Sequence, residues 1–156
     1  MNKYIRKGFG FGLTSGVITT LGMLIGLTTV SESKVIVAGG IVSIAIADAA
    51  SDALGIHIAE ESSEKIKTSS LWTATLSTFF SKFFFASTFL LPILFFQLKT
   101  AVIICLIWGY SLLVLFSYVI AKDKKENPLH AIVEHITIAT IVLLIIHYTG
   151  KILNQI

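Results

Sequence analysis

Long apolar stretches separated by short charged segments dominate the chain. Breaking the sequence at its charged clusters leaves five stretches that can each cross a hydrocarbon core about 30 Å thick, which takes roughly 20 helical residues. They predict helices over about residues 9–30, 35–59, 70–97, 100–121 and 129–151. Because the runs are continuous rather than alternating, they favour helices over the strands of a membrane barrel. We therefore predict an all-α polytopic membrane protein, residues 1–156, forming a single domain of five transmembrane helices.

The connections between these stretches are short and carry most of the remaining charge. If the N-terminus is cytoplasmic, eight Lys and Arg residues lie on the cytoplasmic side and three on the other. Lys and Arg are in excess in cytoplasmic loops, so we expect the N-terminus inside and the C-terminus outside. We interpret the first stretch as a retained helix rather than a signal peptide, because no small-residue cleavage site closes it.

Composition agrees with this assignment. Apolar residues make up 54% of the chain and charged residues 13%, against about 25% charged in an ordinary globular protein. The single cysteine, Cys105, can form neither an internal disulfide nor a thiolate cluster. The sequence has no nucleophile with its base, no phosphate-binding glycine loop and no cysteine–histidine metal motif, so we do not expect an enzyme.

Four ionisable side chains fall inside the predicted spans: Asp48, Asp52, Lys82 and Glu134. An ionisable group at bilayer depth costs roughly 2.5–3.5 kcal/mol on insertion scales, so it usually faces a partner or a watery cavity. Asp48 and Asp52 are four residues apart, which places both carboxylates on one helix face. Counting about 1.5 Å per residue from the charged clusters puts Asp52, Glu134 and Ser15 at similar depth, with Asp48 about one turn deeper.

This pattern predicts a carboxylate-rich cation site open to the cytoplasm. Two like charges close together in a low dielectric favour a metal ion, a shared proton or a lysine between them. Oxygen ligands suit a hard or borderline divalent cation, so we predict metal binding by Asp48, Asp52, Glu134 and Ser15, with Lys82 as counter-ion. Alternatively, Lys82 neutralises one aspartate in a buried pair. Three carboxylates against one lysine favour the cation site.

Further candidates lie nearer the predicted cytoplasmic ends of the helices. Glu60, Glu61 and Glu64 could collect cations at an entrance, although an exposed acidic run is usually just a solvated helix end. His130 shares a helix face with Glu134 and could add a nitrogen ligand there, or could equally be a solvated residue at a helix start. The other three histidines point to other faces and receive no role.

Glycines recur on one face of the first predicted helix, at four-residue intervals. They are Gly8, Gly12 and Gly16, followed by Gly22 and Gly26. Small residues at this spacing let another backbone approach closely. The face therefore predicts either ordinary packing within the chain or a subunit interface or pathway-lining surface.

Short motifs follow one another along four of the spans. They are Gly12-Leu13-Thr14-Ser15-Gly16 with Ile25-Gly26-Leu27, then the run from Ala47 to Ile58, then Leu91-Pro92-Ile93-Leu94, and finally His147-Tyr148-Thr149-Gly150. In order and spacing they resemble the vacuolar iron transporter family, which includes the yeast calcium-cross-complementer type. The resemblance implies a five-helix homodimer that moves iron(II) or manganese(II) out of the cytoplasm, along a pathway lined by the first helices and coupled to protons.

The chain departs from that family pattern at three positions. The family's first-helix aspartate is Ser15 here, its second-helix methionine is Asp52, and a small second-helix residue is Asp48. A carboxylate is thus lost from one helix and gained on its neighbour. The long cytoplasmic metal-binding helices of plant members are also absent, so the resemblance implies a divergent, prokaryotic-like member.

The sequence therefore predicts a transporter for divalent metal cations in the cell membrane. Its expected partners are the lipid bilayer, the transported metal ion and a second copy of the chain, with no nucleic acid and no cofactor other than the transported ion. Two alternatives stay open. One is a non-transporting membrane scaffold with a buried pair between Lys82 and an aspartate, and the other is a monovalent-cation or proton carrier.

Overall fold

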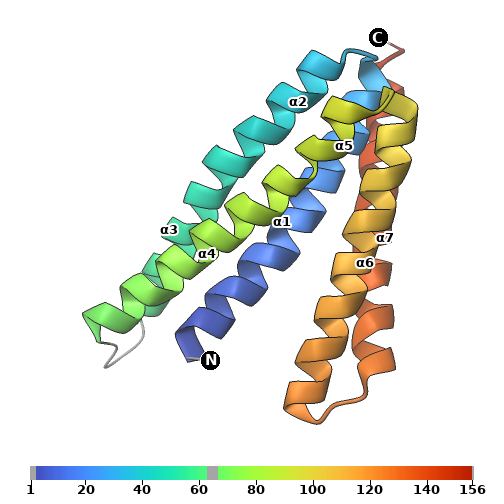
Figure 1. The fold of residues 1–156 in the computed structure, drawn as a ribbon. Coiled ribbons are helices and arrows are strands. Elements are labelled where there is room, and N and C mark those ends of the chain that lie inside the picture. The colour runs from blue at the N-terminus through green and yellow to red at the C-terminus, as the bar shows by residue number, and fades with distance from the viewer. Residues whose placement is uncertain (1–2, 63–66, 156) are drawn as a thin grey trace. The chain divides into compact units, whose positions relative to one another are not determined.

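The computed structural model describes residues 3–62 and 67–155 (Figure 1). Within these ranges the chain is 91% helix and contains no strand. The elements are α1 (Lys3–Val30), α2 (Lys34–Ser43), η1 (Ile44–Asp48), α3 (Ala49–Glu61), α4 (Thr68–Thr88), α5 (Leu90–Phe95), α6 (Leu98–Lys124) and α7 (Pro128–Leu153). They form five spans that are long and apolar enough to cross a membrane: Lys3–Val30, Lys34–Glu61, Thr68–Phe95, Leu98–Lys124 and Pro128–Leu153. The all-helical membrane fold is thereby confirmed, whereas its orientation and single-domain organisation stay predictions.

The second span is not the uniform helix that its sequence suggests. Between α2 and α3, the segment η1 (Ile44–Asp48) is a π-helix, whose hydrogen bonds span five residues instead of four. Such wider turns are frequent at functional sites, and this one ends at Asp48. From Asp48 onward the helix is α-helical, so Asp48 and Asp52 keep the four-residue spacing that places them on one face.

The third span breaks between α4 and α5, at Phe89. Pro92 lies four residues after Thr88 and has no backbone N–H to donate to the Thr88 carbonyl, and its ring crowds that carbonyl. The Thr88 hydroxyl donates to the Phe85 carbonyl at 2.6 Å. The proline therefore gives a local reason for the helix break.

The chain divides into two compact units, and each is described by itself. The first unit comprises Met1–Thr20 and Ile41–Leu90, and the second comprises Leu21–Gly40 and Leu91–Ile156. The first three spans each contribute residues to both units.

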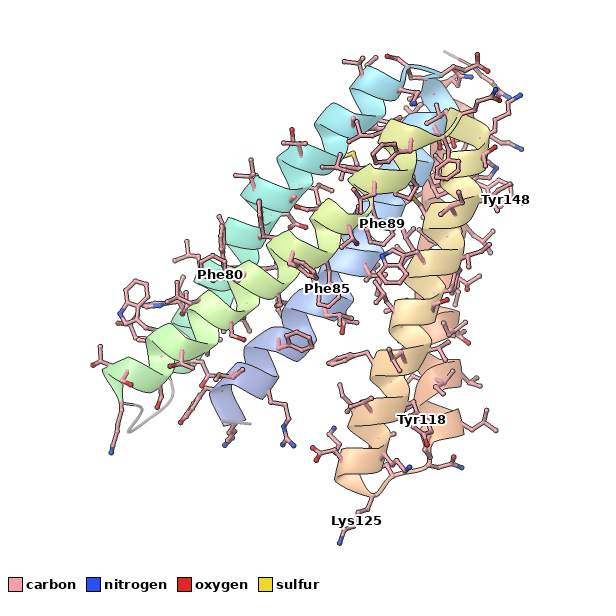
Figure 2. The ribbon with its side chains drawn as sticks, viewed as in Figure 1. Phe80, Phe85, Phe89, Tyr118, Lys125 and Tyr148 are labelled. Carbon is pink, nitrogen blue, oxygen red and sulfur yellow. The ribbon has the colours of Figure 1, made fainter. Side chains whose placement is uncertain are left out.

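In the first unit, the glycine face of α1 packs against α4. A Cβ added to Gly8 would lie 2.5 Å from the carbonyl oxygen of Ala74, and one added to Gly12 would collide with the Ser81 hydroxyl. Gly16 is buried on the same face. This part of the predicted glycine face therefore serves packing within the chain. Large apolar side chains such as Phe80 project outward from α4 (Figure 2), as a lipid-facing surface requires.

In the second unit, α6 and α7 are antiparallel neighbours joined by a tight turn. Lys125 ends α6 in the left-handed conformation with φ of 60°, at the tip of the turn (Figure 2). The N–H of Glu126 donates to the Ala121 carbonyl at 2.9 Å, which satisfies an orphan carbonyl at the helix end. Asn127 then caps α7 with its side chain, and Pro128 occupies the first helical turn, where no N–H is needed.

The last ten residues of α1 belong to this unit and pack on α7. A Cβ added to Gly22 would lie 2.7 Å from Cδ1 of Ile146, and one added to Gly26 would lie 3.3 Å from Cγ2 of the same residue. These glycines too provide room for a neighbouring helix of the same chain.

Candidate cation site

Lys82 on α4 is the centre of a charged cluster in the first unit. Its side chain is completely buried, at 0% exposure. Its Nζ lies 2.5 Å from Oδ2 of Asp52 and 2.6 Å from Oδ2 of Asp48. It also donates a hydrogen bond of 2.8 Å to the Ser15 hydroxyl. The ammonium is thus surrounded by three oxygens, as many as it has protons.

Ser15 and the two aspartates hold the ammonium in different ways. The Ser15 hydroxyl donates to Oδ2 of Asp52 at 2.6 Å, so serine, aspartate and lysine form a closed triangle. Oδ2 of Asp48 is buried and has no aligned hydrogen bond, so its contact with Lys82 is an ion pair only. Asp48 is therefore the less completely satisfied of the two carboxylates.

The helix register explains why these residues meet. An ion pair between Lys7 on α1 and Glu60 on α3 shows that these two residues lie at the same height along their helices. Because these helices run in opposite directions, moving eight residues along each from that pair leads to Ser15 and Asp52. At about 1.5 Å per residue, this second contact lies roughly 12 Å further from the segment that joins α3 to α4.

Lys82 reaches the same level from further along α4. Helical side chains tilt toward the N-terminus of their own helix, so the lysine leans back toward the start of α4 and thus toward Asp52. Gly16 of α1 gives the lysine room, since an added Cβ there would lie 3.2 Å from Cγ of Lys82. The glycine face and the charged cluster therefore depend on the same close approach of α1 to α4.

The cluster carries more negative than positive charge. Two carboxylates face one ammonium, and the Asp48 and Asp52 side chains are 30% and 20% exposed while the lysine is fully covered. The carboxylates can therefore be reached from the surface of the unit, but the lysine cannot.

Within the first unit the structure brings together Ser15, Asp48, Asp52 and Lys82. Glu134 and His130 are exposed residues of α7 in the second unit. Within residues 3–62 and 67–155, no group of three His, Cys, Asp or Glu side chains could hold a metal ion. The sequence left open a lysine paired with a single aspartate, whereas Lys82 contacts both aspartates and Ser15.

The predicted entrance ligands lie in three different situations. Glu60 is 6% exposed and pairs with Lys7, so it is not part of a freely solvated acidic run. Glu61 is exposed at the end of α3. Glu64 lies outside the described residues. The pairing of Glu60 was missed from the sequence, although its eight-residue offset from Asp52 matches the offset between Lys7 and Ser15.

The three histidines left without a role share one arrangement that the sequence did not reveal. In each case, Nδ1 of the histidine lies within hydrogen-bond distance of a Ser or Thr hydroxyl on another helix. That hydroxyl also donates to the backbone carbonyl four residues before it in its own helix. The pairs are His57 with Thr75 at 3.0 Å, His135 with Ser117 at 2.7 Å and His147 with Thr29 at 3.2 Å. A hydroxyl has one proton, so both bonds form together only when Nδ1 is the donor.

The fold and the cluster define an integral membrane protein with five helices suited to crossing a bilayer and a lysine held by two aspartates within one unit. Comparisons of the chain with protein-family models, with curated proteins and with solved structures found no match. The family resemblance seen in the sequence therefore stays an expectation.

Proposed function

We propose that this protein is a membrane transporter for cations and that Asp48 and Asp52 form its binding site. One observation carries the proposal: two partly exposed carboxylates, in a span suited to crossing a membrane, share a single ammonium. The remaining negative charge attracts a cation, and the Ser15 hydroxyl adds a neutral oxygen ligand.

A divalent metal such as iron(II) or manganese(II) is the proposed cargo, exported from the cytoplasm. The two carboxylates together carry two negative charges, so a divalent ion that displaces the Lys82 ammonium would balance them. Carboxylate and hydroxyl oxygens suit manganese, and iron(II) accepts them together with water. In this proposal Lys82 is the cation that holds the site closed when no metal is bound. A dimer would require another face of α1, because the glycine face packs within the chain.

Metal uptake into proteoliposomes tests this proposal. Purified protein is reconstituted around a metal-sensitive dye, and manganese or iron(II) is added outside. The variant combining Asp48→Asn and Asp52→Asn keeps side-chain size and removes both charges, and should lower uptake at least tenfold. The matched control is Glu32→Gln, which removes one exposed carboxylate between α1 and α2 and should leave uptake unchanged. Equal uptake by the native protein and the double variant would contradict the proposed site.

A second candidate is a non-transporting scaffold in which the cluster only holds helices together. It is favoured by the complete burial of Lys82 and by the absence, among the described residues, of three clustered metal ligands of the His, Cys, Asp and Glu types. If the protein is such a scaffold, its liposomes should show no metal or proton flux above that of empty liposomes. Under this candidate, Lys82→Met changes the unfolding free energy and no flux.

A further inference from the structure

A groove of about 300 Å³ lies between α3 and α4 in the first unit, apart from the charged cluster. Ala50 and Ala53 of α3 give it depth because their side chains are short, and Phe79 of α4 lines the same stretch. His57 and Trp72 line its other end, where their rings meet edge to face with centroids 4.9 Å apart. The lining is almost entirely apolar apart from His57 and Thr75.

The one acceptor in this groove that has no partner among the described residues belongs to His57. When Thr75 donates its only proton to the Leu71 carbonyl at 2.9 Å, the 3.0 Å contact between Thr75 and Nδ1 of His57 is a bond that the histidine donates. In the neutral ring, Nε2 is then an acceptor with a free lone pair. Thr75 is therefore a positioning residue that fixes which nitrogen of His57 accepts.

The two ends of the groove lie at different depths. His57 is four residues from the end of α3, and Trp72 is four residues after the start of α4, so both lie about 6 Å from their helix ends. Tryptophan is enriched at this level of membrane proteins, where the bilayer meets water. Ala50 and Phe79 are seven residues further along their helices, about 10 Å deeper. The groove thus has a polar end near the interface and an apolar end toward the bilayer core.

We propose that this groove binds a membrane lipid that has a free hydroxyl group at the level of its glycerol backbone. The hydroxyl donates to Nε2 of His57, the glycerol region packs on Trp72, and an acyl chain lies over Ala50 and Ala53. The lipid class follows from the single acceptor: a lipid hydroxyl can donate to it directly, whereas a fully esterified lipid has no donor and leaves the acceptor to water. This site is independent of the cation cluster and of the proposed transport.

Tryptophan quenching by brominated lipids tests the proposal. In a Trp108→Phe background, Trp72 is the single tryptophan, and it is 52% exposed. The protein is reconstituted into phosphatidylcholine vesicles with increasing amounts of diacylglycerol that has dibrominated acyl chains. The comparison lipid is the same molecule with its hydroxyl acetylated. We expect the free-hydroxyl lipid to bind about fivefold more tightly, as one net hydrogen bond allows.

The variants separate a binding role from a structural one. His57→Phe keeps a ring in the groove but removes the acceptor, and should abolish the preference for the free hydroxyl. Thr75→Val removes the group that fixes the histidine proton, and should reduce the preference even if His57→Phe does not fold. His135→Phe, a histidine with the same hydroxyl arrangement on α7, should leave the preference intact. Equal quenching by the two lipids in the native protein, or an unchanged preference in both groove variants, would overturn the proposal.

Discussion

Replacing Lys82 by methionine isolates the energetic role of the charged cluster. Methionine keeps most of the length and volume of the lysine stem but supplies no charge and no donor. Asp48 and Asp52 would then face each other without a cation, and the Ser15 hydroxyl would lose a hydrogen bond. The expected result is strong destabilisation of the fold.

The size of the effect follows from burial. Removing one partner of a buried ion pair costs about 3–5 kcal/mol, because the remaining charge is left uncompensated. The two aspartates are 20–30% exposed and keep some contact with their surroundings, so we expect about 3 kcal/mol for Lys82→Met. Removing both carboxylates as Asp48→Asn and Asp52→Asn leaves the fully buried ammonium alone, so this double variant should lose at least as much.

The triple variant provides the decisive comparison. With lysine and both carboxylates neutralised, no charge stays uncompensated, and replacing a buried charged group as a whole is often neutral or stabilising. We expect the unfolding free energy of the triple variant, Lys82→Met with Asp48→Asn and Asp52→Asn, to lie within about 1 kcal/mol of that of the native protein. The losses of the single and double variants would then be non-additive by about 5 kcal/mol. Reversible unfolding in mixed micelles, followed by tryptophan fluorescence, measures all four free energies. Additive losses, or a loss below about 0.5 kcal/mol for Lys82→Met, would refute the reasoning.

Two further predictions concern the backbone. Gly12→Ala should destabilise the protein by about 1–3 kcal/mol, because its Cβ collides with the Ser81 hydroxyl, whereas Gly55→Ala, with nothing within 4 Å, should be neutral or stabilising by up to about 1 kcal/mol. The same unfolding measurement checks both, and equal effects at the two glycines would contradict the packing of α1 on α4. Lys125→Gly should stabilise the turn between α6 and α7 by about 0.5–1 kcal/mol, because the left-handed φ of 60° is strained for lysine and free for glycine; a loss of stability would argue against that turn.

Much of the candidate site could be anticipated from the spacing of charges along single helices. That Asp48 and Asp52 share a face could be predicted because residues four apart lie on the same face of an α-helix. The structure keeps this arrangement because the π-helix ends at Asp48. The depth of Ser15 could also be estimated, since counting residues from the charged ends gives a distance along a helix. Such counting has no information about the direction in which a neighbouring helix lies.

Several contacts between helices were correspondingly missed. The bond between His57 and Thr75 joins two helices, and neither residue stands out within its own span. Glu60, one residue of an acidic run that looked solvated, is buried and pairs with Lys7. The π-helix and the break at Phe89 were not predicted from the sequence either, although Pro92 marked the second of these.

The sequence by itself determined that this chain is a helical membrane protein, because the low charge and the length of each apolar run are properties of single segments that the bilayer selects. It also indicated which four ionisable residues fall inside the apolar spans, where a charge is expected to be costly. Only the tertiary structure decided that Lys82 is shared by both aspartates and Ser15. That outcome depends on α1 approaching α4 closely enough, through glycines without side chains, for three helices to place their polar groups around one ammonium.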